Sequence, residues 1–329
     1  MSRLLLTLLL LPVLCTCTST PQGNHDRAPE AEVDPAPKIT AEKYVYPTEK
    51  PRRLILDSDT ANEIDDLFAI AYLLAGEDPT VELLGINSAQ WFHVWSGDST
   101  VYQSQRLNED LVALAGRTDL PLPLGADIIM GKPWGDYDAR DSPAARFIIE
   151  QAHATPEEEK LAVMCIGAAT NLASALALDS TITDKIVAYV LGFRYDFEGG
   201  FWNKDEFNIR RDLNAANYLL NQEGLELHVM PISVAIQYKF RMDETFARLE
   251  RSGAMGPYLR RRWETNATDQ PERVMWDVAL LQGFLRPEQA PETAVLTPPE
   301  NTRRAVWMFT DVDEQQMEAD YWKRLTEGE

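Results

Sequence analysis

From residue 51 onward, the chain alternates short, continuous apolar runs with longer stretches of helical periodicity. Continuous apolar runs bounded by turn residues are typical of strands buried on both faces, and parallel strands are usually joined by a helix. The predicted strands cover 53–59, 81–89, 120–127, 161–166, 184–193 and 225–234. The predicted helices cover 63–76, 143–154 and 171–178, and the segment 206–220 separates the last two strands. The alternation therefore predicts a single Rossmann-like α/β domain with a mainly parallel sheet flanked by helices.

The first predicted strand and helix carry four carboxylates within ten positions, namely Asp57, Asp59, Asp65 and Asp66. Sites in parallel sheets lie at the carboxyl ends of the strands, which is where Asp57 and Asp59 are expected. Unpaired buried carboxylates are costly, so they need protonation, partner groups or a metal, and oxygen ligands suit Ca²⁺ or Mg²⁺. Acids also cap helix starts, so that simpler role for Asp65 and Asp66 stays open.

Further segments extend the acidic motif, in the order "IGAATNLASAL" at 166–176, "EFNIRRD" at 206–212 and "MWD" at 275–277. With the opening "DSDTANEIDD", they resemble the inosine-uridine nucleoside hydrolase family over residues 51–325. The resemblance implies Ca²⁺-dependent hydrolysis of the N-glycosidic bond of ribonucleosides, which gives ribose and a free base. Homodimers or homotetramers are also implied by the resemblance alone.

The resemblance also implies roles for individual residues. The metal ligands would be the carboxylates of Asp59, Asp66 and Asp277 and the backbone carbonyl of Ile166. Asp59 would also be the general base that takes a proton from water. Asp57 would be an acid that orients its neighbours.

Substrate contacts follow from the same motifs. Asp65, Asn208 and Asp277 are expected near the 2′ and 3′ hydroxyls of ribose, and Glu206 near the 5′ hydroxyl. Trp276 stands where many family members have His, and this version resembles the purine-preferring branch, in which stacking raises the basicity of the leaving base.

Three assignments near these motifs keep simpler alternatives. Trp276 would otherwise be a core residue near a helix start. His93 is a candidate general acid, with a solvent-facing loop histidine as the alternative, and Asn171 is expected to cap a helix.

The amino terminus is predicted to direct export. Residues 1–17, with Arg3 and a short leucine-rich run, have the layout of a signal sequence that is too short to span a membrane. Cys17 resembles a bacterial lipoprotein processing site, which predicts a lipid-anchored periplasmic or cell-surface protein. The alternatives are ordinary signal cleavage and a retained hydrophobic anchor. If Cys17 is lipidated and Cys15 removed, Cys165 remains as the single thiol and no disulfide framework forms. Residues 18–50 are predicted to be a disordered Pro-rich tether before the domain at 51–325.

The net charge of the chain restricts the classes of molecule that it is expected to bind. Lys and Arg number 31 against 52 Asp and Glu, and the net charge of −21 argues against nucleic-acid binding. The expected partner is a small nucleoside, with membrane contact only through the anchor. A rival prediction is a Mg²⁺ phosphatase resembling the haloacid dehalogenases, with Asp57 as nucleophile and Asp59 as acid/base. Another is a non-catalytic, Ca²⁺-dependent nucleoside- or sugar-binding lipoprotein.

Overall fold

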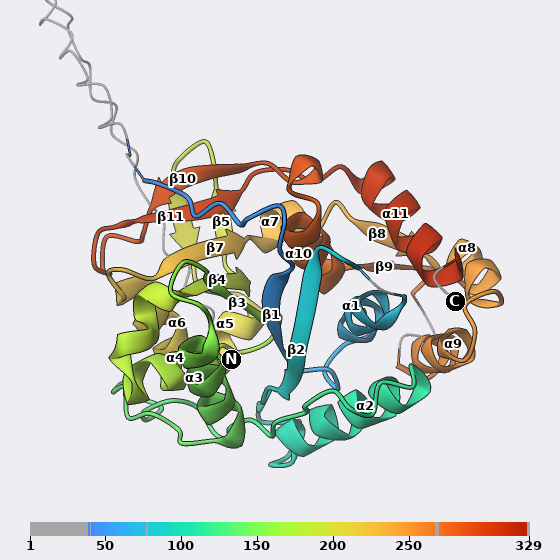
Figure 1. Ribbon diagram of the computed structural model, residues 1–329, viewed down its shortest axis with the longest axis horizontal. Coiled ribbons are helices and arrows are strands. Elements are labelled where there is room, and N and C mark those ends of the chain that lie inside the picture. The colour runs from blue at the N-terminus through green and yellow to red at the C-terminus, as the bar shows by residue number, and fades with distance from the viewer. Residues whose placement is uncertain (1–38, 40, 77, 267–269, 328–329) are drawn as a thin grey trace, which may run out of the picture. The chain divides into compact units, whose positions relative to one another are not determined.

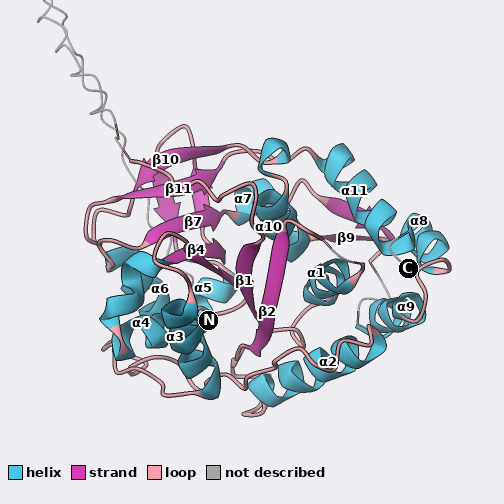
Figure 2. Cartoon of the chain, in the orientation of Figure 1, coloured by secondary structure: helices cyan, strands magenta, loops and turns pink. Residues whose placement is uncertain are grey.

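A seven-stranded sheet forms the centre of the computed structural model, which describes residues 39, 41–76, 78–266 and 270–327 (Figure 1). Its strand order is β10-β11-β7-β4-β3-β1-β2, and only β10 runs antiparallel to its neighbour. The strands are β1 (Arg52–Ser58), β2 (Val81–Ser88), β3 (Leu161–Cys165), β4 (Ile186–Leu191), β7 (Glu226–Met230), β10 (Glu292–Leu296) and β11 (Ala305–Phe309). Helices lie on both sides of these strands, which confirms the predicted α/β class (Figure 2).

The alternation of side chains along each strand builds two hydrophobic cores. In β1, Leu54 and Leu56 join one core and Ile55 joins the other, because successive side chains point to opposite faces. The first core is covered by α1 (Asp65–Leu74), α2 (Thr100–Leu114), α7 (Ile232–Ala235), α8 (Met242–Leu249), α9 (Met255–Asn266), α10 (Trp276–Leu285) and α11 (Glu314–Glu327). The second is covered by α3 (Pro143–Ala154), α4 (Thr170–Leu178), α5 (Phe207–Arg211) and α6 (Leu213–Asn221). Figure 1 shows α3, α4 and α6 on one side of β1, and α1, α2 and α9 on the other.

Short elements complete the described chain. Two small antiparallel sheets pair β5 (Arg194–Asp196) with β6 (Phe201–Asn203), and β8 (Lys239–Arg241) with β9 (Glu272–Val274). Two 3₁₀ turns, η1 (Ser180–Lys185) and η2 (Pro287–Gln289), follow α4 and α10. Among the helices of the described residues, none is both long and apolar enough to cross a membrane.

The strand predicted at 120–127 is wrong. This segment runs beside β2 without joining the sheet as a strand. The carbonyls of Pro121 and Pro123 accept from the amides of Ile86, at 3.0 Å, and Ser88, at 3.3 Å. Proline has no amide hydrogen to return, so a regular ladder cannot form here.

The domain begins before residue 51, inside the predicted tether. The rings of Tyr44 and Tyr46 pack against the first core, and the backbone amide of Tyr44 donates to both carboxylate oxygens of Glu226, at 2.9 and 3.0 Å. Lys43 pairs with Glu292. These contacts make residues 41–50 part of the compact unit, which starts at Ile39. The predicted signal sequence, Cys17 and the rest of the tether lie outside the described residues.

Candidate active site

The ends of β1 and β3 and the starts of α1, α5 and α10 meet around a cavity of about 180 Å³. All the residues assigned from the sequence to the metal or the ribose are among its lining, together with Trp276, whereas Asp57 is not. They are Asp59, Asp65, Asp66, Ile166, Glu206, Asn208 and Asp277. The position agrees with the expectation that sites in parallel sheets lie at the carboxyl ends of strands.

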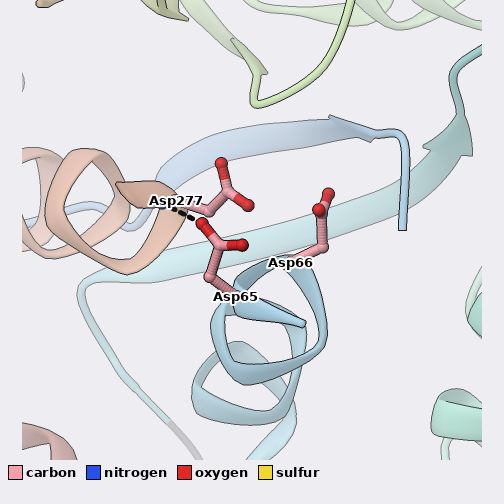
Figure 3. A group of neighbouring side chains, drawn as sticks. All are labelled: Asp65, Asp66 and Asp277. Atoms are coloured by element: carbon pink, nitrogen blue, oxygen red, sulfur yellow. Dashed lines mark hydrogen bonds between the residues drawn. The ribbon is translucent and has the colours of Figure 1, made fainter. Parts of the chain in front are cut away.

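Three carboxylates from two helix starts form the closest group. One oxygen each from Asp65, Asp66 and Asp277 lies within 4.8 Å of the others, and all three side chains are buried. Figure 3 shows Asp65 and Asp66 on the first turn of α1, with Asp277 facing them from the start of α10. The backbone amide of Asp277 donates to Asp65 Oδ2 at 3.3 Å, and the hydroxyl of Ser58 donates to Asp66 Oδ1 at 2.6 Å. The positive ends of both helix dipoles favour these anions.

Asp59 lies on the same cavity, in the loop after β1. It is 1% exposed, and its Oδ2 atom has no hydrogen-bond partner among the described residues. Gly167, two residues beyond β3, leaves the space for this side chain. A Cβ at Gly167 would lie 2.8 Å from the Cβ, Cγ and Oδ1 atoms of Asp59, so no larger residue fits without a shift.

Burial and mutual repulsion raise the pKa values of these acids. Burial, followed by the charge of Glu63, raises the pKa of Asp65 to about 7. Burial and neighbouring carboxylates also raise the pKa of Asp59, Asp66 and Asp277 well above the usual range. Carboxylates this close and this dry ionise together only when a cation offsets their charge. The unpartnered oxygen of Asp59 and the all-oxygen donor set therefore fit a hard divalent cation.

The sequence model of one protein family, the inosine-uridine preferring nucleoside hydrolases, matches residues 54–292 of this chain. The chain belongs to this family. Uridine nucleosidase 1 of Arabidopsis thaliana is 28% identical over 59% of this chain and 60% of the relative. The inosine-uridine preferring nucleoside hydrolase of Crithidia fasciculata is 30% identical over 52% of this chain and 58% of the relative. The matches thus span less than two thirds of either relative. The solved structure of a plant nucleoside hydrolase aligns with a TM-score of 0.66 at 19% identity, over 84% of this chain and 99% of that chain, which shows the shared fold.

Within this nucleoside hydrolase fold, Asn208, which the sequence predicts to contact ribose, makes hydrogen bonds inside the protein. Its side-chain amide donates to the carbonyl of Ile166 at 2.9 Å and to the carbonyl of Leu191 at 3.3 Å. The carbonyl assigned from the family resemblance as a metal ligand is thus held in place by a residue that also lines the cavity. A carbonyl oxygen has two lone pairs, so the bond from Asn208 leaves one for a ligand.

Glu206 is the N-cap of α5 and also lines the cavity. Its Oε2 accepts from the amide of Ile209 at 3.1 Å. Burial raises the pKa of this carboxyl, although backbone hydrogen bonds oppose the shift. One side chain therefore both starts the helix and presents a carboxyl to the cavity.

Asp57 was expected to orient its neighbours, and among the described residues its side chain is hydrogen-bonded to two amide side chains and to none of the other carboxylates. Its side chain leaves β1 toward α4 and accepts from Asn87 at 3.2 Å and from Asn171 at 3.0 and 3.3 Å. Burial raises the pKa of Asp57 to about 7. Ser58, the next residue along the strand, points to the other face and holds Asp66 instead. Alternation along the strand separates the two roles.

Asn171 is not the helix cap that the sequence predicted. It is the second residue of α4, whose N-cap position is Ala169. Besides bonding Asp57, its amide donates to the carbonyl of Ser88 at 3.1 Å, and its oxygen accepts from the amide of Ala126 at 2.9 Å. Residues that hydrogen-bond Asp57 in this way can be recognised in the sequence as polar side chains inside an apolar strand or helix, and Asn87 in β2 is a second example.

Of the two ring side chains predicted to act in the site, Trp276 lines the cavity and His93 does not. Trp276 is the first residue of α10, half-buried, and both lines the cavity and packs against the first core. His93 is not part of the cavity lining among the described residues; its Nδ1 accepts from the amide of Trp95 at 3.1 Å. Its ring lies 6.2 Å from that of Phe207, which does line the cavity.

Proposed function

We propose that this protein is a Ca²⁺-dependent ribonucleoside hydrolase that cleaves the N-glycosidic bond to give ribose and a free base. One observation carries the proposal: Asp59, whose buried Oδ2 atom has no hydrogen-bond partner among the described residues, lines a cavity that also holds Asp65, Asp66 and Asp277. Such a group combines a base with a place for a divalent cation, and family membership supplies the reaction class.

The residues of the chain divide the work of the reaction. Asp59, Asp66, Asp277 and the carbonyl of Ile166 would hold the ion, and the position of Asp65 in the carboxylate group adds it as a fifth candidate. When bound, Ca²⁺ would supply positive charge that offsets the carboxylates and makes the attacking water more acidic. Asp59 would accept the proton of that water, because its side chain lines the cavity and Gly167 leaves it room.

The ribose would be bound by polar side chains that line the cavity. Glu206 and Asn208 flank one side, and Asp65 and Asp277 belong to the carboxylate group. Three sugar hydroxyls lose water on entering, and buried polar groups replace those hydrogen bonds. This recognition would favour ribonucleosides over their deoxy counterparts.

We also propose a preference for purines, supported by Trp276 at the cavity wall. An indole that stacks on the leaving base stabilises it as it takes up charge, and a purine offers more ring face than a pyrimidine. The names of some relatives point the other way, since Uridine nucleosidase 1 of Arabidopsis thaliana is one of them. Inosine, guanosine and uridine must therefore be compared directly.

A mixed nucleoside panel assayed for free ribose, with and without a chelator, tests the proposal. Asp59→Asn should lower kcat by a factor of roughly 10² to 10⁴, as expected for loss of a general base. Asp184→Asn, at an exposed acid in η1 outside the cavity lining, is the control and should leave turnover unchanged. Near-normal ribose release by Asp59→Asn at saturating Ca²⁺ would refute the assignment. Binding without hydrolysis by the wild type would indicate a nucleoside-binding lipoprotein.

Export and lipid anchoring through Cys17 form part of the same proposal, supported by the leucine-rich run before it. A homodimer or homotetramer is proposed on family resemblance alone. Light scattering of the purified protein measures this oligomeric state.

A further inference from the structure

A cationic side chain borders the acidic cavity. Arg194, the first residue of β5, lines the cavity and is exposed to solvent. In the part of the chain that the structure describes, its guanidinium has no ion pair or hydrogen-bond partner. A free guanidinium at the mouth of a site built from carboxylates, in a protein with a net charge of −21, is available to an anionic ligand.

The backbone around Arg194 is fixed by α7. The amide of Ile232 donates to the carbonyl of Phe193 at 3.0 Å. On the other side, the amide of Tyr195 donates to the hydroxyl of Ser233 at 3.3 Å, and that hydroxyl donates to the carbonyl of Tyr195 at 3.0 Å. Both neighbours of Arg194 are therefore anchored, which holds the start of its side chain at the cavity rim.

Arg194 lies on the Glu206 side of the cavity. A Cβ at Gly192, two residues before Arg194, would lie 3.0 Å from Glu206 Oε2, so this carboxyl rests directly against the segment that carries the arginine. Glu206 is the residue assigned above to the 5′ hydroxyl of ribose. A substituent on the 5′ carbon would therefore point toward Arg194.

A second guanidinium strengthens the positive field at the mouth. Arg211 stacks on Phe207, a cavity residue, with its guanidinium carbon 4.6 Å from the ring centroid. It donates to the carbonyl of Phe92 at 3.1 Å, and its buried Nε has no partner among the described residues. Arg210, the adjacent residue, is instead paired with Asp205 at 3.0 Å and lies outside the cavity lining.

We infer that Arg194 recognises an anionic group on the 5′ carbon, so that the substrate class includes nucleoside 5′-monophosphates. This inference rests on the proposed hydrolase function. The C1′–N bond breaks and a C1′–O bond forms with water; one water proton passes to Asp59, the released base is protonated from solvent, and the products are ribose 5-phosphate and the free base. Guanidinium and phosphate form strong paired hydrogen bonds, whereas the carboxylates alone would repel a dianion.

Parallel kinetics on inosine and inosine 5′-monophosphate test the inference with the full chain and Ca²⁺. Wild type should cleave both, with ribose 5-phosphate identified by mass spectrometry. Arg194→Gln should lower kcat/KM for the monophosphate at least tenfold more than for inosine. The control Arg210→Gln should leave both values unchanged. Rising ionic strength should also weaken the monophosphate reaction more than the inosine reaction.

The outcomes separate this inference from the proposed function. Cleavage of inosine without cleavage of the monophosphate, or an equal proportional loss on both substrates in Arg194→Gln, would overturn it and leave Arg194 as a counter-charge for the acids. If wild type cleaves neither, the hydrolase proposal fails. Calorimetric binding of inosine 5′-monophosphate then decides the inference, which stands if Arg194→Gln weakens binding at least tenfold and falls if it does not.

Discussion

Gly167→Ala places one methyl group against the proposed base and so tests whether catalysis depends on the position of Asp59. The added Cβ would lie 2.8 Å from three atoms of the Asp59 side chain. Gly167 is not at a positive φ, so alanine adds no backbone strain of its own. The perturbation is therefore purely one of space.

The size of the effect follows from that distance. Ordinary contacts of this kind begin at 3.4 Å, so the Asp59 carboxylate must move by at least about 0.6 Å, the difference between 3.4 and 2.8 Å. A displacement of about 1 Å from productive geometry can cost on the order of 10²-fold in rate. We expect kcat to fall by about 10- to 100-fold, and overpacking to lower the free energy of unfolding by about 1–3 kcal/mol.

Ribose release at saturating Ca²⁺, paired with a melting curve, measures both effects. Gly283→Ala is the matched control. Gly283 lies in α10, outside the cavity lining, and its added Cβ would be 3.1 Å from the side chains of Ala290 and Phe309. The control should alter Tm and leave kcat near the wild-type value. Wild-type turnover by folded Gly167→Ala would show that the position of Asp59 is not limiting and would refute the reasoning.

Three further predictions concern other parts of the chain. Trp276→Ala should remove about 1–3 kcal/mol of stacking, lowering kcat more for inosine than for uridine; equal losses with a lower Tm would indicate a core role instead. Burial alone would raise the pKa of Asp78, but hydrogen bonds from Thr80 and the charge of Arg324 hold it at about 2. Because this pKa is below the unfolded value near 4, Asp78 should contribute about 1–2 kcal/mol above pH 4, after allowance for solvent screening, and lose it as the pH falls toward 2. Denaturant titrations of Asp78→Asn should converge with the wild type at that acid limit, and a gap that persists there would contradict the ion-pair explanation. Cys17→Ala should move the protein out of the membrane fraction, whereas unchanged fractionation and unchanged mass would exclude acylation.

Features that depend on neighbouring residues could be predicted from the sequence. The apolar runs around Leu56 and Val163 indicate buried strands because side-chain alternation and burial repeat along the backbone. Asp59, Asp65 and Asp66 come together for the same reason, since one strand, one short loop and one helix start connect them. The segment 120–127 shows the limit, because apolar content alone does not reveal that its prolines prevent strand pairing.

Contacts between distant segments were decided by the tertiary structure. Asp277 reaches Asp65 only because α10 packs against α1, and the motif resemblance could associate these residues without showing their contact. Asn208 was assigned to the substrate, yet it also holds the carbonyl of Ile166, because a side-chain amide takes whichever acceptors the packed backbone offers. Backbone periodicity is local and can be predicted from sequence, whereas the partner of a buried polar group depends on which strand and helix ends the fold brings together.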